Sequence, residues 1–365
     1  MKKRSETQQL TAVDFFAGAG GLTVGLKKAG FRVVAAVEID PAAARTYAAN
    51  HPEVKLLVKD IREVTAKEIL ELTGLKSIDL VAGCPPCQGF STLADKQHRN
   101  DERNQLVSDM ARLVRELQPK ACMMENVPGL SQRGMPLLGA FENELDAMGY
   151  TVNREVLQMA DYGVPQSRMR LVMLAGKGFD IPLPIATHAR MPESSNVKPW
   201  VKLKDVLKDE SRPVVFSKAK ENGGPQKFNW HVVRDLQPIS VARLKALKPG
   251  ASRFSLPKNL RPKSHKNSKG FQNVYTRMAW GDIAPTMTSG CTTLSSGRFG
   301  HPDQLRTISV REAALIQTFP RRYILDTENI GTACELIGNA LPCRFASAVS
   351  TQCYRAMEKA SVGRS

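Results

Sequence analysis

The sequence predicts an α/β fold, in which a parallel sheet carries helices on both faces and a smaller, loop-rich β domain is attached. Three observations predict it. Short apolar runs alternate with helix-like stretches through the first half of the chain. A glycine-rich turn joins the first apolar run to the first helical stretch. The chain has 365 residues, 42% of them hydrophobic, which is enough for a sizeable core and two domains.

Hydrophobic periodicity places the elements of the first half in order. The predicted strands are Ala12–Phe16, Val33–Glu38, Ile78–Ala82, Ala121–Glu125 and Arg170–Ala175, the last of them buried. The predicted helices are Leu22–Ala29, Ala42–Asn50, Lys67–Leu72, Gln105–Leu117 and Pro136–Met148.

The pattern changes at Thr187, where prolines, glycines and lysines become frequent and periodicity fades, most clearly over Lys248–Gly270. This segment is predicted to be a loop-rich β domain or to be partly disordered when unbound. Regular structure resumes near Ser309 with the helical stretches REAALIQTF and LIGNALPCRFASAVSTQCYRAMEKA, and we expect fraying beyond Lys359.

Charge is concentrated in the second half of the chain. The net charge is +17, and Thr187–Val310 holds 22 Lys and Arg against 8 Asp and Glu. This balance favours a polyanionic partner, although a solvated lysine-rich surface would look the same. No apolar run is as long as a membrane span, and seven scattered cysteines are not typical of a disulfide framework. We therefore expect a cytoplasmic protein.

The turn DFFAGAGG indicates a nucleoside site. Gly18, Gly20 and Gly21 allow a tight turn and a close ligand, and Glu38 follows Gly18 by twenty residues, where an acidic side chain can bind ribose hydroxyls. Asp60 and Ile61 lie at the corresponding strand end of the third strand–helix repeat, where their side chains would suit the amino group and the ring face of an adenine. The turn lacks the GxGxxG pattern, so a nucleoside with a neutral or cationic tail fits better than NAD. A purely structural turn is the alternative.

The stretch GCPPCQGFS follows the strand that ends at Ala82. A CxxC spacing is found in redox pairs and in zinc sites, but no second close cysteine pair is present and two prolines separate Cys84 from Cys87. Because open α/β sheets bind ligands at the carboxyl ends of their strands, Cys87 is predicted to lie at a ligand site and Cys84 to pack structurally, with a redox pair or a metal site as the less favoured alternative.

Six blocks in order resemble those of the C5-cytosine DNA methyltransferases: DFFAGAGG, GCPPCQGFS, ENVPGL, QSRMR, REAALIQTFP and GNALP. The resemblance implies a Rossmann-like, S-adenosylmethionine-dependent methyltransferase sheet with a separate target-recognition domain. It divides the chain into a catalytic and cofactor-binding domain (1–186), a basic target-recognition domain (187–308) and a C-terminal return to the catalytic domain (309–365).

The resemblance also implies roles. Cys87 would add to C6 of cytosine, Glu125 would bind N3, Arg168 would steady the catalytic loop and Arg170 would hold O2, without a metal. The cofactor would be S-adenosyl-L-methionine, leaving as S-adenosyl-L-homocysteine. Its expected contacts are Phe16, Gly18, Gly20, Glu38, Ile39, Asp60, Ile61, Pro86, Leu106, Asn339 and Ala340.

The substrate implied is double-stranded DNA with a flipped-out cytosine, gripped by the basic segment. The expected DNA contacts are Gln88, Ser91, Arg253, Arg261, Lys263 and Thr286. Gly89 is the expected hinge of a closing loop. A prokaryotic monomer is expected, either paired with a restriction endonuclease or an orphan. The alternatives are a tRNA cytosine-5 methyltransferase of related fold and a DNA-binding protein with an inactive enzyme domain.

Overall fold

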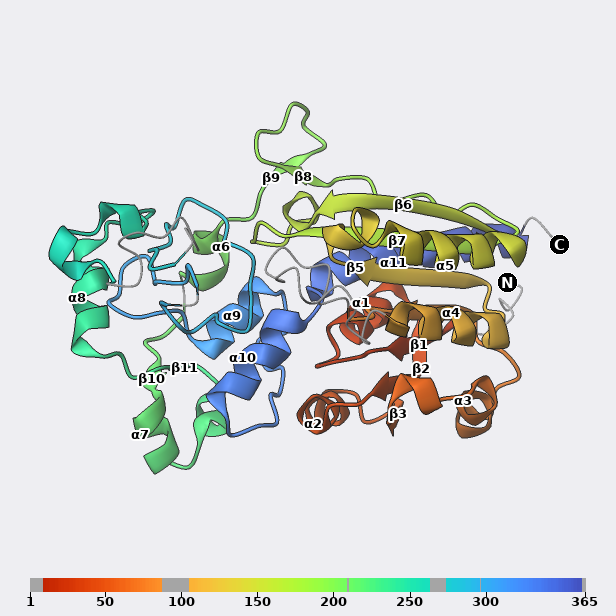
Figure 1. Cartoon of the computed structure of the whole chain (residues 1–365), viewed down its shortest axis with the longest axis horizontal. Coiled ribbons are helices and arrows are strands. Elements are labelled where there is room, and N and C mark those ends of the chain that lie inside the picture. The colour runs from red at the N-terminus through yellow and green to blue at the C-terminus, as the bar shows by residue number, and fades with distance from the viewer. Residues whose placement is uncertain (1–8, 87–104, 209, 263–273, 296, 363–365) are drawn as a thin grey trace, which may run out of the picture. The chain divides into compact units, whose positions relative to one another are not determined.

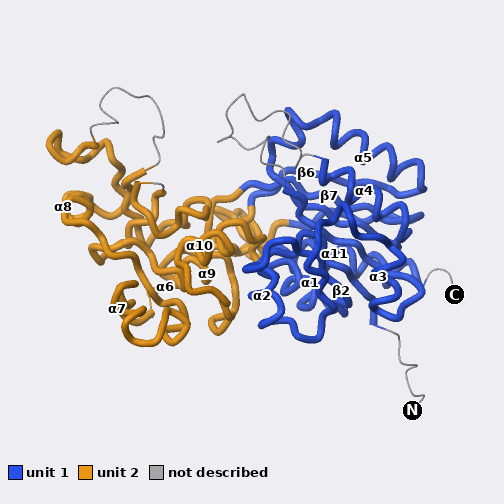
Figure 2. The backbone as a smooth tube through the Cα atoms, turned by 60° about the horizontal axis from the view of Figure 1, so that its bottom comes forward, with its two compact units in different colours: residues 1–158, 169–185, 343–365 blue, residues 159–168, 186–342 orange. Residues whose placement is uncertain are grey.

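The computed structural model describes residues 9–86, 105–208, 210–262, 274–295 and 297–362 (Figure 1). The predictions for Cys87, Gln88, Gly89, Ser91 and Lys263 lie outside these residues. The chain forms two compact units (Figure 2). Unit 1 comprises Met1–Gln158, Met169–Ile185 and Cys343–Ser365, and unit 2 comprises Met159–Arg168 and Ala186–Pro342.

Unit 1 is built on a seven-stranded sheet of order β3-β2-β1-β4-β5-β7-β6. The first five strands in this order are parallel, whereas β7 is antiparallel to both of its neighbours. The strands are β1 Thr11–Phe15, β2 Arg32–Glu38, β3 Lys55–Val58, β4 Leu80–Gly83, β5 Ala121–Asn126, β6 Tyr150–Gln158 and β7 Met169–Lys177. The predicted parallel sheet is therefore confirmed for β1, β2, β4 and β5.

Helices cover both faces of this sheet, as predicted. They are α1 Gly21–Ala29, α2 Pro41–Asn50, α3 Ala66–Thr73, α4 Leu106–Leu117, α5 Met135–Ala147 and α11 Cys343–Val362. Val13 and Phe15 of β1 pack into a core with α3, α4 and α5. Asp14, between them in sequence, points to the other face, where it meets Thr23 of α1. Helix α11 packs there too, since a Cβ on Gly25 would lie 2.3 Å from the Cβ of Ala346.

Two strands and one helix break were not predicted. β3 is only four residues long, KLLV, and β6, the edge strand, mixes polar and apolar residues along YTVNREVLQ, so neither gives a long apolar run. The last helical stretch divides into α10 Ile330–Asn339 and α11, with Pro342 between them, because proline cannot continue a helix. α11 extends to Val362, beyond the predicted frayed end.

Unit 2 is loop-rich, as predicted, and its described strands are only two residues long. They are β8 His188–Ala189, β9 Lys198–Pro199, β10 Val214–Val215 and β11 Val232–Val233. Its α-helices are α6 Leu203–Leu207, α7 Phe216–Glu221, α8 Pro238–Ala246, α9 Val310–Ile316 and α10. Residues 309–342 belong to this compact unit, so the physical boundary differs from the expected one at 308, while the functional division stays a prediction.

Buried polar interactions hold unit 2 together. Glu312 is buried in α9, accepts two hydrogen bonds from Arg306 at 2.7 and 2.8 Å, and closes a capping box with Ser309. Trp230 is also buried, and its indole N–H donates to Leu325 O. None of the described helices is long and apolar enough to cross a membrane.

Candidate active site

The glycine turn after β1 forms one side of the site. Phe16, Gly18 and Gly20 all have positive φ angles, of 58°, 54° and 87°, and Gly20 is the N-cap of α1. A Cβ placed on Gly18 would meet nothing within 4 Å, so this side of the turn is open. The backbone therefore turns sharply and leaves room for a ligand beside it.

Glu38, at the end of β2, is fixed by two backbone N–H groups. Gly18 N donates to its Oε2 at 2.7 Å and Asp40 N donates to its Oε1 at 2.8 Å. Burial raises the pKa of the Glu38 carboxyl, and these hydrogen bonds oppose the shift. A carboxylate accepts about four hydrogen bonds, so capacity is left for a pair of hydroxyl groups.

Asp14 lies behind the turn and was not predicted as a site residue. Thr23 Oγ1 donates to Asp14 Oδ2 at 2.6 Å and lies 2.7 Å from Tyr47 OH. The other oxygen, Asp14 Oδ1, is buried and has no hydrogen-bond partner among the described residues. Burial raises the pKa of Asp14 to about 7, with the charge of Glu38 adding to the shift. The available signal was a carboxylate inside the apolar run TAVDF.

The residues expected around the adenine differ in exposure. Ile39 is 59% exposed, whereas Ile61 is buried in the sheet core, against which Leu106 at the start of α4 also packs. Arg62 binds both oxygens of Asp60, with Nη2 at 2.6 Å from Oδ2, and this lowers the pKa of Asp60. Ile39 is therefore available to contact a ligand, whereas the carboxylate of Asp60 is already paired with Arg62.

The ends of β4 and β5 and the start of the antiparallel β7 bring together a carboxyl group, a guanidinium group and a thiol. Arg170 Nε lies 2.9 Å from Glu125 Oε1, and both side chains are largely buried. The Cys84 thiol lies beside Glu125; burial raises its pKa well above the usual range, and the charge of Glu125 adds to this. This shift favours the neutral thiol form of Cys84, and the structural role expected for Cys84 stays a prediction.

The loop that follows β4 and leads to Cys87, called the cysteine loop, is held at its start by a residue of β5. Asn126 Nδ2, one residue beyond Glu125, donates to Pro85 O at 2.9 Å. Pro86 is half-buried and is the last residue described before Cys87. The described part of the loop therefore leaves the sheet directly beside the Glu125–Arg170 pair.

Arg168 organises a second cluster, which belongs to unit 2. Its Nη1 donates to Met287 O at 2.7 Å and, at 3.4 Å, to Gly338 O at the end of α10. Asn339 and Ala340 follow directly. Gln317 Nε2 donates to Ala340 O at 2.9 Å, and Gln166 Nε2 donates to Gln317 Oε1. Gln166 and Gln317 were not predicted, although both lie within the quoted blocks.

The described residues expected to contact DNA use their polar groups within unit 2. Arg253 is buried and its guanidinium lies 5.0 Å from the Phe254 ring centroid. Arg261 Nε donates to Leu256 O at 2.9 Å, and Thr286 Oγ1 donates to Ser167 O at 2.6 Å. These contacts give all three side chains a structural role, and their contacts with DNA stay predictions.

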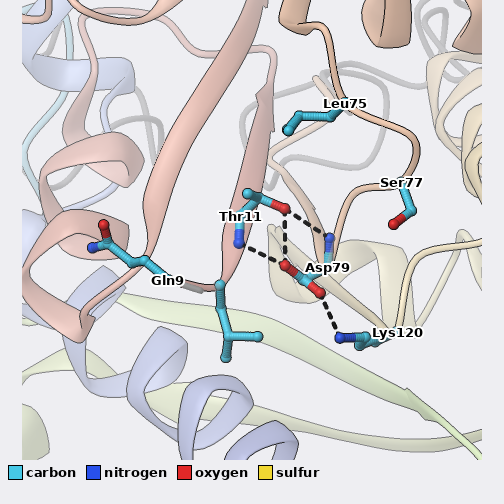
Figure 3. Close-up of a pocket in the computed structure, with 7 residues that line it drawn as sticks. Gln9, Thr11, Leu75, Ser77, Asp79 and Lys120 are labelled. Atoms are coloured by element: carbon cyan, nitrogen blue, oxygen red, sulfur yellow. Dashed lines mark hydrogen bonds and ion pairs between the residues drawn. The ribbon is translucent and has the colours of Figure 1, made fainter. Parts of the chain in front are cut away.

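A small pocket of about 180 Å³ lies at the opposite edge of the sheet (Figure 3). Asp79, before β4, accepts hydrogen bonds from Thr11 N at 2.8 Å and Thr11 Oγ1, and pairs with Lys120 Nζ at 2.7 Å. These polar groups bind one another, and ligands of open α/β sheets bind at the carboxyl edge. The pocket is therefore not the candidate site. In the described ranges, no three His, Cys, Asp or Glu side chains are grouped to hold a metal ion.

Comparison with known proteins gives one consistent result. The sequence model of the C-5 cytosine-specific DNA methylases matches residues 10–355. The chain is 35% identical over 355 residues to the Type II methylase M.HgiDII of Herpetosiphon aurantiacus, covering 95% of each chain. It is 32% identical over 346 residues to the Type II methyltransferase M1.HphI of Haemophilus parahaemolyticus, covering 93% of this chain and 86% of the relative.

Solved structures share the fold. A putative DNA modification methyltransferase encoded within a prophage of E. coli aligns with a TM-score of 0.72 at 26% identity, over 96% of this chain and 99% of that one. The Dnmt2 methyltransferase of S. pombe aligns with a TM-score of 0.65 at 18% identity, over 97% of this chain and 99% of that one.

Proposed function

The chain belongs to the C-5 cytosine-specific DNA methylases, and on this premise we propose which of its residues bind the cofactor, carry out the chemistry and meet the DNA. It is a DNA (cytosine-5-)-methyltransferase, similar to methylases of Type II restriction–modification systems. The tRNA alternative has less support, because the family model is that of DNA methylases and the curated relatives described above are Type II methylases.

Members of this family are S-adenosylmethionine-dependent methyltransferases, and the glycine turn fits this cofactor. The open side of Gly18 leaves space for a nucleoside, and Glu38 has acceptor capacity for ribose hydroxyls. Asp14 Oδ1 is buried without a hydrogen-bond partner among the described residues, and a cationic tail beside this carboxyl, whose pKa is about 7, would draw it into its charged form. Phe16, Gly20, Ile39, Asp60, Ile61, Pro86, Leu106, Asn339 and Ala340 stay the proposed remaining contacts. When bound, the cofactor supplies an electrophilic methyl group.

The single observation that carries the chemistry is the Arg170–Glu125 ion pair of 2.9 Å, beside the start of the cysteine loop. The Cys87 thiolate adds to C6 of the target cytosine, and the electron pair of the C5–C6 double bond makes C5 nucleophilic. Glu125 binds N3 and Arg170 binds O2, so both act where charge develops on the ring. After methyl transfer, loss of the C5 proton and elimination of Cys87 restore the aromatic ring.

Trapping with a duplex oligonucleotide that carries 5-fluorocytosine tests this mechanism. The wild-type protein is expected to form a covalent adduct that survives denaturation, because fluorine at C5 prevents the final elimination. Cys87→Ser should form none, while Cys84→Ala should still form it. An adduct with Cys87→Ser, or its loss in a folded Cys84→Ala protein, would overturn the assignment of the nucleophile.

The proposed substrate is duplex DNA, supported by the +14 net charge of Thr187–Val310. Methyl incorporation into plasmid DNA and into total tRNA separates the two nucleic acids, and bisulfite sequencing of methylated DNA gives the recognition site. A restriction endonuclease partner, a monomeric state and a cytoplasmic location stay proposals. Co-expression with neighbouring genes, size-exclusion chromatography and cell fractionation test them in turn.

A further inference from the structure

Two polar contacts join helices α1 and α2 of unit 1. Thr23 and Lys27 lie one turn apart on the same face of α1. Tyr47 and His51 lie one turn apart at the end of α2, where His51 is the C-cap. Thr23 Oγ1 is 2.7 Å from Tyr47 OH, and Lys27 Nζ is 2.7 Å from His51 Nδ1. The Thr23–Tyr47 link and the Lys27–His51 link therefore connect the two helices at successive turns.

The chemistry of the groups fixes the donor and the acceptor of each link. Thr23 gives its one hydroxyl proton to Asp14 Oδ2, so Tyr47 OH donates to Thr23 Oγ1. An ammonium group can only donate, so His51 Nδ1 accepts from Lys27. Burial and the charge of Lys27 lower the pKa of His51 to about 4, so the ring is neutral near neutral pH. The links therefore depend on two atoms in particular, the Tyr47 hydroxyl oxygen and His51 Nδ1.

Both helices begin at the proposed cofactor site. Gly20 of the glycine turn is the N-cap of α1, and Asp40 is the N-cap of α2. The Glu38 carboxylate accepts hydrogen bonds from Gly18 N and Asp40 N, so it connects the two helix starts beside the site. The two links connect the same helices further along. The distance between the glycine turn and Glu38 is therefore fixed by contacts at both places.

Apolar packing alone gives α2 little support. Its ten residues, PAAARTYAAN, bury only Ala43, Ala44, Thr46 and Tyr47. Alanine side chains bury little apolar area, so Tyr47 is the one large anchor of this helix. The Tyr47 ring meets the His51 ring edge to face, with the ring centroids 4.8 Å apart, and both side chains are buried. The position of α2 against α1 therefore depends on Tyr47 and His51, whose hydrogen bonds are directional.

We propose that Tyr47 and His51 are positioning residues of the S-adenosylmethionine site, which hold Glu38 at the distance from the glycine turn that the cofactor requires. The inference rests on the proposed cofactor site. The two residues act through α1 and α2 and do not touch the reacting atoms. When either link is broken, α2 can shift, and binding must then restore the arrangement of the glycine turn and Glu38. The affinity for the cofactor therefore falls more than the rate at saturating cofactor.

Calorimetric titration of the full chain with S-adenosyl-L-homocysteine tests the first link. Tyr47→Phe removes the hydroxyl and keeps the ring, so Kd should rise roughly 3–10-fold, as for the loss of one buried hydrogen bond. Tyr150→Phe is the matched control, because the buried Tyr150 hydroxyl donates to Pro119 O at 2.5 Å, just before β5 and at the opposite edge of the sheet. Both variants should unfold at lower urea concentration, but only Tyr47→Phe should bind more weakly. Wild-type affinity in Tyr47→Phe would overturn the proposal.

Two substitutions of His51 test the second link. His51→Asn keeps an acceptor near the position of Nδ1 and should bind S-adenosyl-L-homocysteine almost as the wild type does, whereas His51→Leu has no acceptor and should bind more weakly. In methyl-transfer assays, Tyr47→Phe and His51→Leu should raise KM for S-adenosylmethionine more than they lower kcat. Equal affinities of His51→Asn and His51→Leu would overturn the role of His51. A wild-type protein that binds no S-adenosyl-L-homocysteine would instead overturn the proposed cofactor site itself.

Discussion

Unit 1 and unit 2 position their functional side chains in different ways. In unit 1, Glu125 and Arg170 face each other because β5 and β7 are neighbouring strands in fixed register. In unit 2, Arg168 reaches backbone carbonyls of two segments far away in sequence, and the described strands of that unit are only two residues long. In unit 1, the register of the sheet fixes the positions of the proposed catalytic side chains. In unit 2, the packing of loops and short helices depends on individual buried polar side chains.

The largest expected effect is on the chemistry of unit 1. Glu125→Ala removes the group proposed to bind N3 and leaves Arg170 without its carboxylate partner, so kcat should fall roughly 10²–10⁴-fold. Methyl transfer from labelled cofactor to a DNA duplex measures it. Glu144→Gln is the matched control, because Glu144 pairs with Arg115 on the surface of the same unit at 2.9 Å. Wild-type turnover in Glu125→Ala would show that the reaction does not take place at the carboxyl ends of β4 and β5.

The next effect tests the dependence of unit 2 on buried polar pairs. Glu312→Gln leaves Arg306 buried and poorly neutralised, and breaking such a pair costs about 3–5 kcal/mol. Urea unfolding measures the loss, and the solvent-exposed pair Lys67–Glu71 offers a control in which Glu71→Gln should change nothing measurable. If Glu312→Gln unfolded like the wild type, unit 2 would not depend on this pair.

The two units also differ in how much of their structure could be predicted from the sequence. Alternating apolar runs predicted β1, β2, β4 and β5, and with them the edge that carries Glu125 and the start of the cysteine loop. Asp14 was missed because a single carboxylate in an apolar run gives no sign of which way it faces. In unit 2, Arg168 and Gly338 lie 170 residues apart, and no local period encodes such a contact. Arg253 is buried, which its charge alone could not show, and its contact with DNA stays a prediction.

A third effect separates stability from cofactor binding in unit 1. Asp14 has a folded-state pKa raised from 3.8 to about 7 by burial, so its charged form is disfavoured in the folded protein. The unfolded chain loses this proton first, and stability therefore falls as pH rises from about 4 to 7, by at most about 4 kcal/mol. Thr23, Tyr47, Glu38 and Cys84 face this carboxyl and shape the transition.

Asp14→Asn should remove that slope and be the more stable protein at pH 8, yet bind the cationic cofactor more weakly there. Urea unfolding at pH 5 and pH 8, together with calorimetric titration of S-adenosylmethionine, measures both. Asp79→Asn is a control of opposite sign: Lys120 and Thr11 lower the pKa of Asp79 despite its burial, so its stabilising effect is lost as pH falls. If the free energy of unfolding of Asp14→Asn depended on pH as that of the wild type does, the raised pKa of Asp14 would be contradicted.

The smallest effect concerns packing between α1 and α11 in unit 1. A Cβ on Gly25 would lie 2.3 Å from Ala346 Cβ and 2.7 Å from backbone atoms of α11, which cannot move as a flexible side chain would. Gly25→Ala should therefore destabilise unit 1 by about 1–3 kcal/mol through overpacking. Gly139→Ala in α5 is the matched control, because a Cβ there meets nothing within 4 Å and alanine favours a helix by up to about 1 kcal/mol. Chemical unfolding should show a lower free energy of unfolding for Gly25→Ala and a higher one for Gly139→Ala. A stabilised Gly25→Ala would mean that α11 does not pack this closely against α1.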